Sequence, residues 1–330
     1  MTQKPQQKKI KWGIIGLGGI AHKFANDLIT IEDAELYAVA SRSQEKADEF
    51  AQQYGATKAY ASYEDLANDP NIEAVYIATP HALHKDNALM CLEKDIAVLG
   101  EKPFAMNAQE VDEMIAKAKE KNVLLMEALW TYFLPHYQYV LKELENKTYG
   151  NILKIESDFG FTMPYDTDKR LFNKSMGGGS LLDIGIYPIF SSLSTLGMPN
   201  SIEAKADFFE NGTDSSCDMI FSYDNDIKSY LKSTIKEVTP TEAIFYCENG
   251  TIKINREFHI PTTVTIIANG EQRTIDFGYN PDIFGYRYEA VHFNQLLRAG
   301  KTESDIMTFD FSKKLIKLLD DVREIINLEY

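Results

Sequence analysis

Cysteine is scarce in this sequence, and its few copies are scattered. The 330 residues contain three cysteines, Cys91, Cys217 and Cys247, and no Cys-x-x-Cys pair. An odd number of widely spaced cysteines excludes a disulfide framework and a cysteine-based zinc site, and it is typical of a reducing compartment. We therefore expect a cytoplasmic protein that folds without disulfides or a structural metal.

The sequence also lacks long apolar runs and an excess of positive charge. No stretch of about 18 apolar residues could span a membrane as a helix, and the polar first nine residues show no signal-peptide pattern. Lysine and arginine total 34 against 49 aspartates and glutamates, which gives a formal net charge of −15. This balance opposes binding to nucleic acid or to an anionic membrane surface. A small molecule is the expected partner.

The first part of the chain has the pattern of an α/β domain. Short apolar runs, such as 10–15, 74–78 and 97–99, alternate with segments of helical periodicity up to Glu127. Strands that alternate with helices indicate a parallel sheet with right-handed crossovers. We predict a doubly wound, dinucleotide-binding Rossmann domain over residues 1–128.

The hydrophobic period changes to two after Pro135, as in the stretch 153–161. Asn-Gly pairs at 249–250 and 269–270 predict hairpins, and apolar residues at helical spacing over 315–326 predict a closing helix. We therefore predict a second, α+β domain over residues 129–330, with a large and mostly antiparallel sheet, for substrate binding and oligomerisation.

A glycine-rich turn follows the first predicted strand and opens the first predicted helix. Its first glycine permits a tight turn, its second lets the backbone approach a phosphate, and a small sixth residue lets the helix pack on the strand. The helix N-terminus presents free N–H groups to a pyrophosphate. The pattern G-x-G-x-x-A predicts a dinucleotide site, rather than a purely structural turn, over Gly16, Leu17, Gly18, Gly19, Ile20 and Ala21.

The end of the second predicted strand bears on the choice between NAD and NADP. NAD-specific sites usually have an aspartate or glutamate there to hold the ribose hydroxyls, but this sequence has Ser41 and Arg42. A guanidinium can pair with a 2′-phosphate and stack on adenine, and a serine can donate a hydrogen bond. We predict NADP as the cofactor, with NAD possible.

Several motifs, in order along the chain, resemble those of the glucose–fructose oxidoreductase / inositol dehydrogenase (Gfo/Idh/MocA) family. After the glycine turn they are Thr79-Pro80-His81 with His84, Glu101-Lys102-Pro103, and Asp-Ile-Gly-Ile-Tyr at 183–187. The match covers essentially the whole chain, and Glu-Lys-Pro at the end of a strand is its more specific part.

One branch of that family is the most similar. Glu-Ala-Leu-Trp-Thr at 127–131 and the segment 177–183, Gly-Gly-Gly-Ser-Leu-Leu-Asp, resemble the dimeric dihydrodiol dehydrogenases and NADP-dependent xylose dehydrogenases. Tyr187, where most of the wider family has histidine, matches that branch. Tyr132 departs from it, because the branch tends to have arginine there, and this departure leaves the substrate open.

The resemblance implies an NAD(P)-dependent dehydrogenase or reductase acting on CH–OH groups, with Lys102, Tyr187 and Asp183 as catalytic residues. Lys102 follows the strand 97–99, so it lies at the carboxyl edge of the parallel sheet, where ligands of such sheets bind. A phenol has an ordinary pKa of about 10, which a nearby ammonium lowers, so Tyr187 would exchange the alcohol proton with help from Lys102. Asp183, four residues earlier, would orient the substrate or Lys102.

The resemblance also places residues beside the cofactor. Thr79, Pro80 and His81 would border the nicotinamide, and Glu101 shares its motif with Lys102. His84 would contact and orient the residues that border the cofactor, or it would simply be a histidine on a helix face. A metal held by the two histidines would need further ligands, none of which lies nearby in the sequence, so we predict no metal site.

Trp130 and Phe159 would form the walls of a substrate pocket with Tyr187, although both could equally be core aromatics. By resemblance the substrate is a sugar, polyol, inositol or trans-dihydrodiol, and the sequence leaves the choice and the reaction direction open. Two alternatives remain: a non-catalytic NAD(P)-binding regulator, and an enzyme that uses retained NAD for transient oxidation in a hydrolytic or eliminating reaction.

The resemblance implies a homodimer that forms through the exposed face of the second sheet. Phe208, Phe209 and Phe221 are the aromatic residues that we expect to point outward there.

Overall fold

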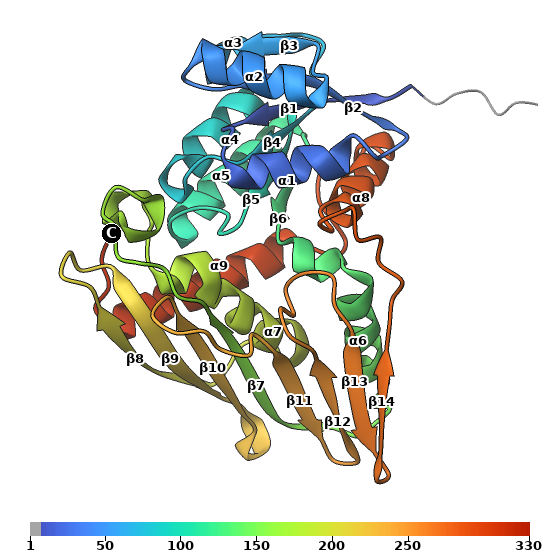
Figure 1. The fold of residues 1–330 in the computed structure, drawn as a ribbon, viewed down its shortest axis with the longest axis vertical. Helices are drawn as coiled ribbons and strands as arrows, with labels where there is room; N and C mark the ends of the chain where they lie inside the picture. The colour runs from blue at the N-terminus through green and yellow to red at the C-terminus, as the bar shows by residue number, and fades with distance from the viewer. Residues whose placement is uncertain (1–7) are drawn as a thin grey trace, which may run out of the picture. The chain divides into compact units, whose positions relative to one another are not determined.

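The computed structural model describes residues 8–330, which form two compact units (Figure 1). The first unit contains residues 8–105, 109–130 and 281–309, and the second contains 106–108, 131–280 and 310–330. The chain leaves the first unit near Trp130 and later returns to it, which a single boundary after residue 128 does not anticipate.

The first unit contains a sheet of six parallel strands in the order β3-β2-β1-β4-β5-β6. The order reverses at β1, so the carboxyl ends of β1 and β4 lie at the switch point where such sheets bind ligands. The predicted doubly wound sheet is confirmed, and the short β3 is a strand that the apolar pattern had not shown. The strands are β1 (Ile10–Ile15), β2 (Ala34–Ala40), β3 (Lys58–Tyr60), β4 (Ala74–Ile77), β5 (Ala97–Glu101) and β6 (Leu125–Ala128).

Helices cover both faces of this sheet. They are α1 (Gly19–Leu28), α2 (Gln44–Tyr54), α3 (Tyr63–Ala67), α4 (His84–Glu93), α5 (Ala108–Lys121) and α8 (Arg287–Arg298). Trp12 of β1 contacts Phe24 of α1 and Phe293 of α8, with ring centroids 5.7 and 5.1 Å apart. A Cβ on the next residue, Gly13, would lie 3.1 Å from Leu66 of α3. Because successive strand residues point to opposite faces, α1 and α8 cover one face and α3 the other.

Polar contacts explain why residues 281–309 belong to the first unit. The buried carboxylate of Asp27, near the end of α1, accepts hydrogen bonds from the backbone N–H groups of Phe284, Gly285 and Arg287 at 2.7–3.3 Å. The side chain of Asn294 in α8 accepts a bond from the indole N–H of Trp12 at 3.0 Å. These buried bonds tie the returning segment to α1 and β1.

The second unit contains an eight-stranded sheet in the order β14-β13-β12-β11-β7-β10-β9-β8. Within this sheet, β7 and β10 are the one parallel pair among the described strands, and the other pairs are antiparallel, so the predicted antiparallel character is confirmed. The turn of β13–β14 is the predicted Asn269-Gly270 pair, and both residues have positive φ. The strands are β7 (Ile152–Gly160), β8 (Ser201–Phe208), β9 (Asp214–Ser222), β10 (Lys228–Thr234), β11 (Ala243–Cys247), β12 (Gly250–Ile254), β13 (Val264–Ala268) and β14 (Glu271–Ile275).

Helices α6 (Pro135–Glu145) and α7 (Ile186–Leu196) pack on the strands of this sheet, and α9 (Phe309–Ile325) closes the chain as predicted (Figure 1). We expected Phe208, Phe209 and Phe221 to point outward from this sheet. This is wrong for Phe221, which is fully buried. Phe209 packs on Tyr165 and Phe172. Phe208 is exposed. The strand register instead gives the opposite face the residues Ile220, Tyr230, Ile244, Tyr246 and Ile267.

Candidate active site

The glycine turn between β1 and α1 leaves its backbone open. Gly16 has φ +86°, and a Cβ there would lie 2.9 Å from the backbone of Ala78 and Thr79, so this position requires glycine. A Cβ on Gly18 or Gly19 would meet nothing within 4 Å. No side chain caps the start of α1, so the turn presents N–H groups at a helix N-terminus, an arrangement that fits a pyrophosphate.

Ser41 and Arg42 follow β2 at the same edge of the sheet. The Ser41 hydroxyl accepts a hydrogen bond from the backbone N–H of Ser43 at 3.3 Å, so part of its capacity is used locally. Arg42 is exposed, and among residues 8–330 no carboxylate forms an ion pair with it. A guanidinium in this setting is available to an anionic ligand.

His84 joins the two motif loops of the first unit. Its Nδ1 lies 2.9 Å from the carbonyl oxygen of Pro103, its Nε2 lies 2.8 Å from that of Thr79, and the ring is buried. Carbonyl oxygens only accept hydrogen bonds, so both contacts are hydrogen bonds at once only when the imidazole carries two protons. His84 therefore supports both loops from within the unit and does not lie on an exposed helix face. His81 begins the 3₁₀ turn η1 (His81–Leu83) and is buried beside it.

The Glu-Lys-Pro motif ends β5, and its peptide Lys102–Pro103 is cis. Glu101 is buried, accepts a hydrogen bond from the Tyr76 phenol, and accepts another from the backbone N–H of Lys102 at 3.1 Å. Lys102 itself is partly exposed. The carboxylate of Glu101 thus fixes the end of β5 and the backbone of Lys102.

A second buried acid, Glu289 of α8, was not found by sequence reasoning. Neither of its carboxyl oxygens has a hydrogen-bond partner among the described residues. Burial raises its pKa well above the ordinary value, and the charges of Glu101 and Asp27 raise it further. Burial therefore favours the neutral form of Glu289, and its place in an amphipathic helix offered no signal beyond the residue type.

In the second unit, Tyr187 belongs to a cluster of three rings. The ring centroid of Tyr187 lies 5.5 Å from that of Phe159 and 5.1 Å from that of His259, and Phe159 and His259 are 4.3 Å apart. Tyr187 is only 4% exposed. Sequence reasoning missed His259, because the loop between β12 and β13 has no periodic pattern that would single it out.

Asp183 is paired within the second unit. Its carboxylate lies 2.6 Å from the guanidinium of Arg170, a partner that sequence reasoning also missed. Asp183 lies in a π-helical turn, η5 (Leu181–Gly185), which runs into α7. Pro188 near the start of α7 has no N–H to donate, and the wider π turn just before it accommodates the ring.

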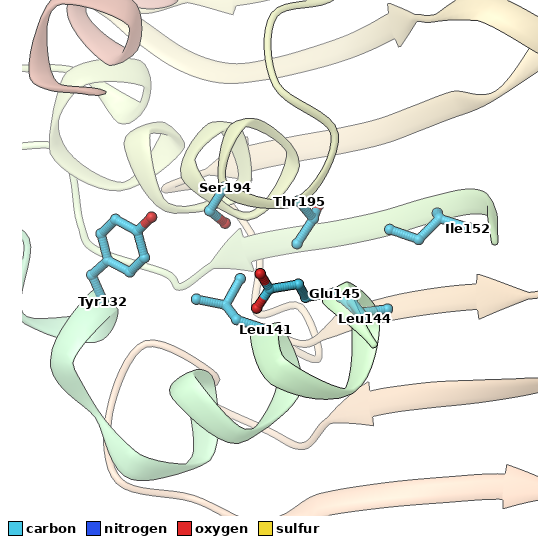
Figure 2. A pocket seen from close by; sticks show the side chains of 7 residues that line it. All are labelled: Tyr132, Leu141, Leu144, Glu145, Ile152, Ser194 and Thr195. Atoms are coloured by element: carbon cyan, nitrogen blue, oxygen red, sulfur yellow. The ribbon is translucent and has the colours of Figure 1, made fainter. Parts of the chain in front are cut away.

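Trp130 and Tyr132 lie in the 3₁₀ turn η2 (Trp130–Phe133), but Trp130 belongs to the first unit and Tyr132 to the second. Trp130 is buried and stacks on Tyr286 within the first unit, with ring centroids 4.1 Å apart. Tyr132 contacts Phe190 of α7 and lines a cavity of about 380 Å³ in the second unit (Figure 2). The other residues lining this cavity are Leu141, Leu144, Glu145, Ile152, Ser194 and Thr195.

Metal and membrane features can be stated for the described residues. No group of three or more histidine, cysteine, aspartate or glutamate side chains within 8–330 could hold a metal ion. Within the same residues, no helix combines the length and the apolar character needed to cross a membrane.

The first unit is a nicotinamide-dinucleotide-binding domain, because its open glycine turn joins the first strand and first helix of a doubly wound sheet. The chain as a whole is an NAD(P)-dependent oxidoreductase. Two family models match it: the oxidoreductase family with an NAD-binding Rossmann fold over residues 10–129, and the GFO/IDH/MocA C-terminal domain over 137–253. The chain belongs to the GFO/IDH/MocA family, and the resemblance inferred from its motifs is confirmed.

Curated relatives match over nearly the whole length. The chain is 38% identical to trans-1,2-dihydrobenzene-1,2-diol dehydrogenase of Xenopus tropicalis, over 97% of this chain and 99% of that protein. It is 32% identical to the Homo sapiens enzyme of the same name, over 97% and 98% of the two chains.

Solved structures share the fold at lower identity. KijD10, a 3-ketoreductase from Actinomadura kijaniata in complex with NADP and TDP-benzene, superposes with a TM-score of 0.87 at 23% identity, covering 97% of this chain and 98% of that one. Aldose-aldose oxidoreductase from Caulobacter crescentus, complexed with glycerol, gives a TM-score of 0.88 at 20% identity and the same coverage.

Proposed function

We propose that this oxidoreductase prefers NADP and that it oxidises or forms a carbinol on a small cyclic diol or sugar, with Tyr187 as the residue that exchanges the hydroxyl proton. The observation that carries this proposal is the position of Tyr187, whose buried phenol lies in a cluster with Phe159 and His259. A phenol can both donate and accept a proton, and the packing of its ring against two neighbouring rings fixes where its hydroxyl lies.

The residues of the first unit would hold the cofactor. The turn 16–20 suits the pyrophosphate, and Arg42 with Ser41 suits a 2′-phosphate. Thr79, Pro80, His81 and Glu101, which follow β4 and end β5, would border the nicotinamide, with His84 behind them. The bound nicotinamide supplies the hydride chemistry, and the protein supplies position and proton transfer.

Tyr187, Lys102 and Asp183 have separate roles in this proposal. In the oxidation direction, the Oη atom of Tyr187 takes the hydroxyl proton of the substrate, and the ammonium of Lys102 favours the phenolate form of Tyr187. Asp183, held by Arg170, orients the substrate or the ammonium. Phe159 supplies an apolar wall of the substrate pocket. Trp130 stacks on Tyr286 and so fixes the segment 127–130 within the first unit.

The substrate class that we favour first is a cyclic trans-dihydrodiol. The relatives with 32% and 38% identity are named for that activity, and the rings of Phe159 and His259 would pack against a flat unsaturated ring. Sugars and inositols come second. A panel of dihydrodiols, aldoses and inositols, followed by nicotinamide absorbance with NADP and with NAD, ranks them directly.

Two substitutions test the proton-transfer roles. Tyr187→Phe and Lys102→Ala should each lower turnover by about two decades or more, while the dissociation constant for NADP changes far less for Tyr187→Phe. Tyr139→Phe and Lys85→Ala are the matched controls and should stay within a few-fold of wild type. Unchanged turnover in either test variant removes that residue from the mechanism. If the enzyme keeps its cofactor tightly bound and converts the substrate with no net redox change, the result would instead favour transient oxidation within a hydrolytic or eliminating reaction.

We also propose a homodimer, formed by the sheet face that carries Tyr230, Ile244 and Ile267. Tyr230 and Ile267 are each 43% exposed, and charged side chains surround them, so this face has the apolar centre and polar rim of an interface. Light scattering of wild type and of Tyr230→Glu tests this, and a wild-type monomer refutes it. A cytoplasmic location is supported by three buried cysteines that form no disulfide.

A further inference from the structure

Asp214, the first residue of β9, has a carboxylate buried against the start of the Tyr187 segment. Its side chain is 0% exposed. One oxygen, Oδ2, accepts hydrogen bonds from the Ser180 hydroxyl at 2.8 Å and from the backbone N–H of Leu181 at 2.7 Å. The Ser180 hydroxyl also lies 3.1 Å from that of Ser233 in β10. The carboxylate therefore links the sheet to the first turn of η5.

The glycines before Ser180 make this approach possible. Gly179 has φ +119°, and a Cβ on it would lie 1.9 Å from the other carboxylate oxygen of Asp214. A Cβ on Gly178 would lie 2.6 Å from the carbonyl oxygen of Arg170. The Gly-Gly-Gly-Ser motif thus lets the carboxylate and the Arg170 loop both pack directly on the chain that enters η5.

The segment that begins there needs support from outside. Residues 181–185 form a π-helical turn, and Pro188 has no backbone N–H with which to bond the preceding turn. Asp183 and Tyr187 both lie within this stretch. Because the internal hydrogen bonding is incomplete, the position of these two side chains depends on what holds the first turn.

We propose that Asp214 is a positioning residue for the reaction: its carboxylate clamps the first turn of η5 and thereby sets where Asp183 and Tyr187 lie. This inference rests on the proposed role of Tyr187. Asp214 acts through the backbone of Leu181 and the hydroxyl of Ser180, and it takes no part in proton transfer.

The charge of Asp214 gives this role a pH signature. Burial raises the pKa of Asp214 to about 6, although the bonds from Ser180 and Leu181 lower it. Two other titratable groups interact with it, the Cys217 thiol and the Tyr330 phenol, and burial keeps the pKa of each well above its ordinary value. Beyond them, Arg323 lies over the Tyr330 ring, and Asp183 is paired with Arg170. Cys217 and Tyr330 stay neutral at moderate pH, so the clamp changes charge near pH 6 through Asp214 itself.

The test compares Asp214→Asn with Asp218→Asn, a change on the same strand at a partly exposed carboxylate 3.9 Å from Lys205. At pH 7.5, Asp214→Asn should lower kcat by roughly 10-fold or more, because a small misplacement of a reacting group is costly, with the NADP dissociation constant within about twofold of wild type. The fall of wild-type kcat below about pH 6 should be absent from the variant. Ser180→Ala, which removes one of the two bonds, should give a smaller loss, and Asp218→Asn should give none.

A readout that needs no turnover separates this inference from the proposed function. Hydrogen–deuterium exchange of residues 181–187 should be faster in Asp214→Asn than in wild type and in Asp218→Asn, with the exchange of β10 unchanged. Faster exchange supports the clamp even if Tyr187→Phe proves fully active, which would refute only the proposed function. Wild-type exchange together with wild-type kcat in Asp214→Asn overturns the clamp, and a general loss of protection across the second unit overturns it as well.

Discussion

Replacing His136 with glutamine should remove a specific part of the acid sensitivity of the second unit. The His136 ring is buried at the start of α6, where its Nε2–H donates to the carbonyl oxygen of Phe258 at 3.0 Å and its Nδ1 accepts from the Tyr279 hydroxyl at 2.7 Å. This pattern requires a neutral imidazole with its proton on Nε2. Burial lowers the pKa of His136 to about 4, and the bond to Phe258 opposes that shift.

The magnitude follows from linkage. A histidine has a pKa of about 6.5 in the unfolded chain, so acidification protonates the unfolded state first and favours unfolding. The folded-state pKa is depressed, so the stabilisation is present above about pH 6.5 and is lost as the pH falls toward 4. A separation of about 2.5 pKa units corresponds to roughly 3 kcal/mol in full, of which about 2 kcal/mol is lost by pH 5.

Urea unfolding at pH 7.5 and at pH 5 measures this loss. Wild type should lose about 2 kcal/mol more than His136→Gln between these two pH values, because contributions from distant groups cancel in the comparison. His22→Gln is the matched control, since His22 also contacts a tyrosine hydroxyl but is only partly buried, and it should behave as wild type does. Equal losses in wild type and His136→Gln, or a proton resonance of His136 that titrates near 6.5, would refute the reasoning. The loss also bears on function, because His136 and Thr131 hold the loop that contains His259.

Three further predictions concern the first unit. Arg42→Ala should weaken NADP binding by roughly 10-fold to 100-fold, the loss of one or two charge-assisted bonds, and leave NAD nearly unaffected; equal affinities in wild type by titration would contradict the assignment. His84→Leu should lower the free energy of unfolding by about 3 kcal/mol, since it leaves the buried carbonyls of Thr79 and Pro103 without their imidazole, and a midpoint in urea equal to that of wild type would exclude this role. Glu289→Gln should be at least as stable as wild type. Its gain in the free energy of unfolding should grow as the pH rises through the raised pKa of Glu289, because ionisation of this buried carboxyl destabilises the folded state. A gain that grows toward acid pH would contradict this prediction.

The periodic features of the chain were sufficient to predict its two sheets. Apolar runs of a strand covered on both faces, as at 74–77, and alternating residues, as in β7, depend on local order alone. The Asn269-Gly270 hairpin was equally visible, because the turn needs positive φ at both residues. The strand β3 was missed, because three half-exposed residues have too little pattern to stand out.

Candidate site residues could be proposed from the sequence only where a motif marks them. Glycine patterns, Glu-Lys-Pro and the 183–187 motif are short and contiguous, so Lys102 and Tyr187 could be named directly. His259, Arg170 and Asp214 could not be named, because each acts through a contact with a residue outside its own stretch of sequence. Glu289 could not be named either, because its raised pKa comes from burial, which the local sequence does not show.

The amino-acid order by itself determined the fold class, the dinucleotide turn and the family, because each depends on spacing within a few residues. The tertiary structure alone decided that residues 281–309 return to the first unit through Asp27, that the ring of His84 spans two loops, and that a buried carboxylate lies against Gly179. Burial and close approach between distant segments determine these features, and they arise only when the chain has folded.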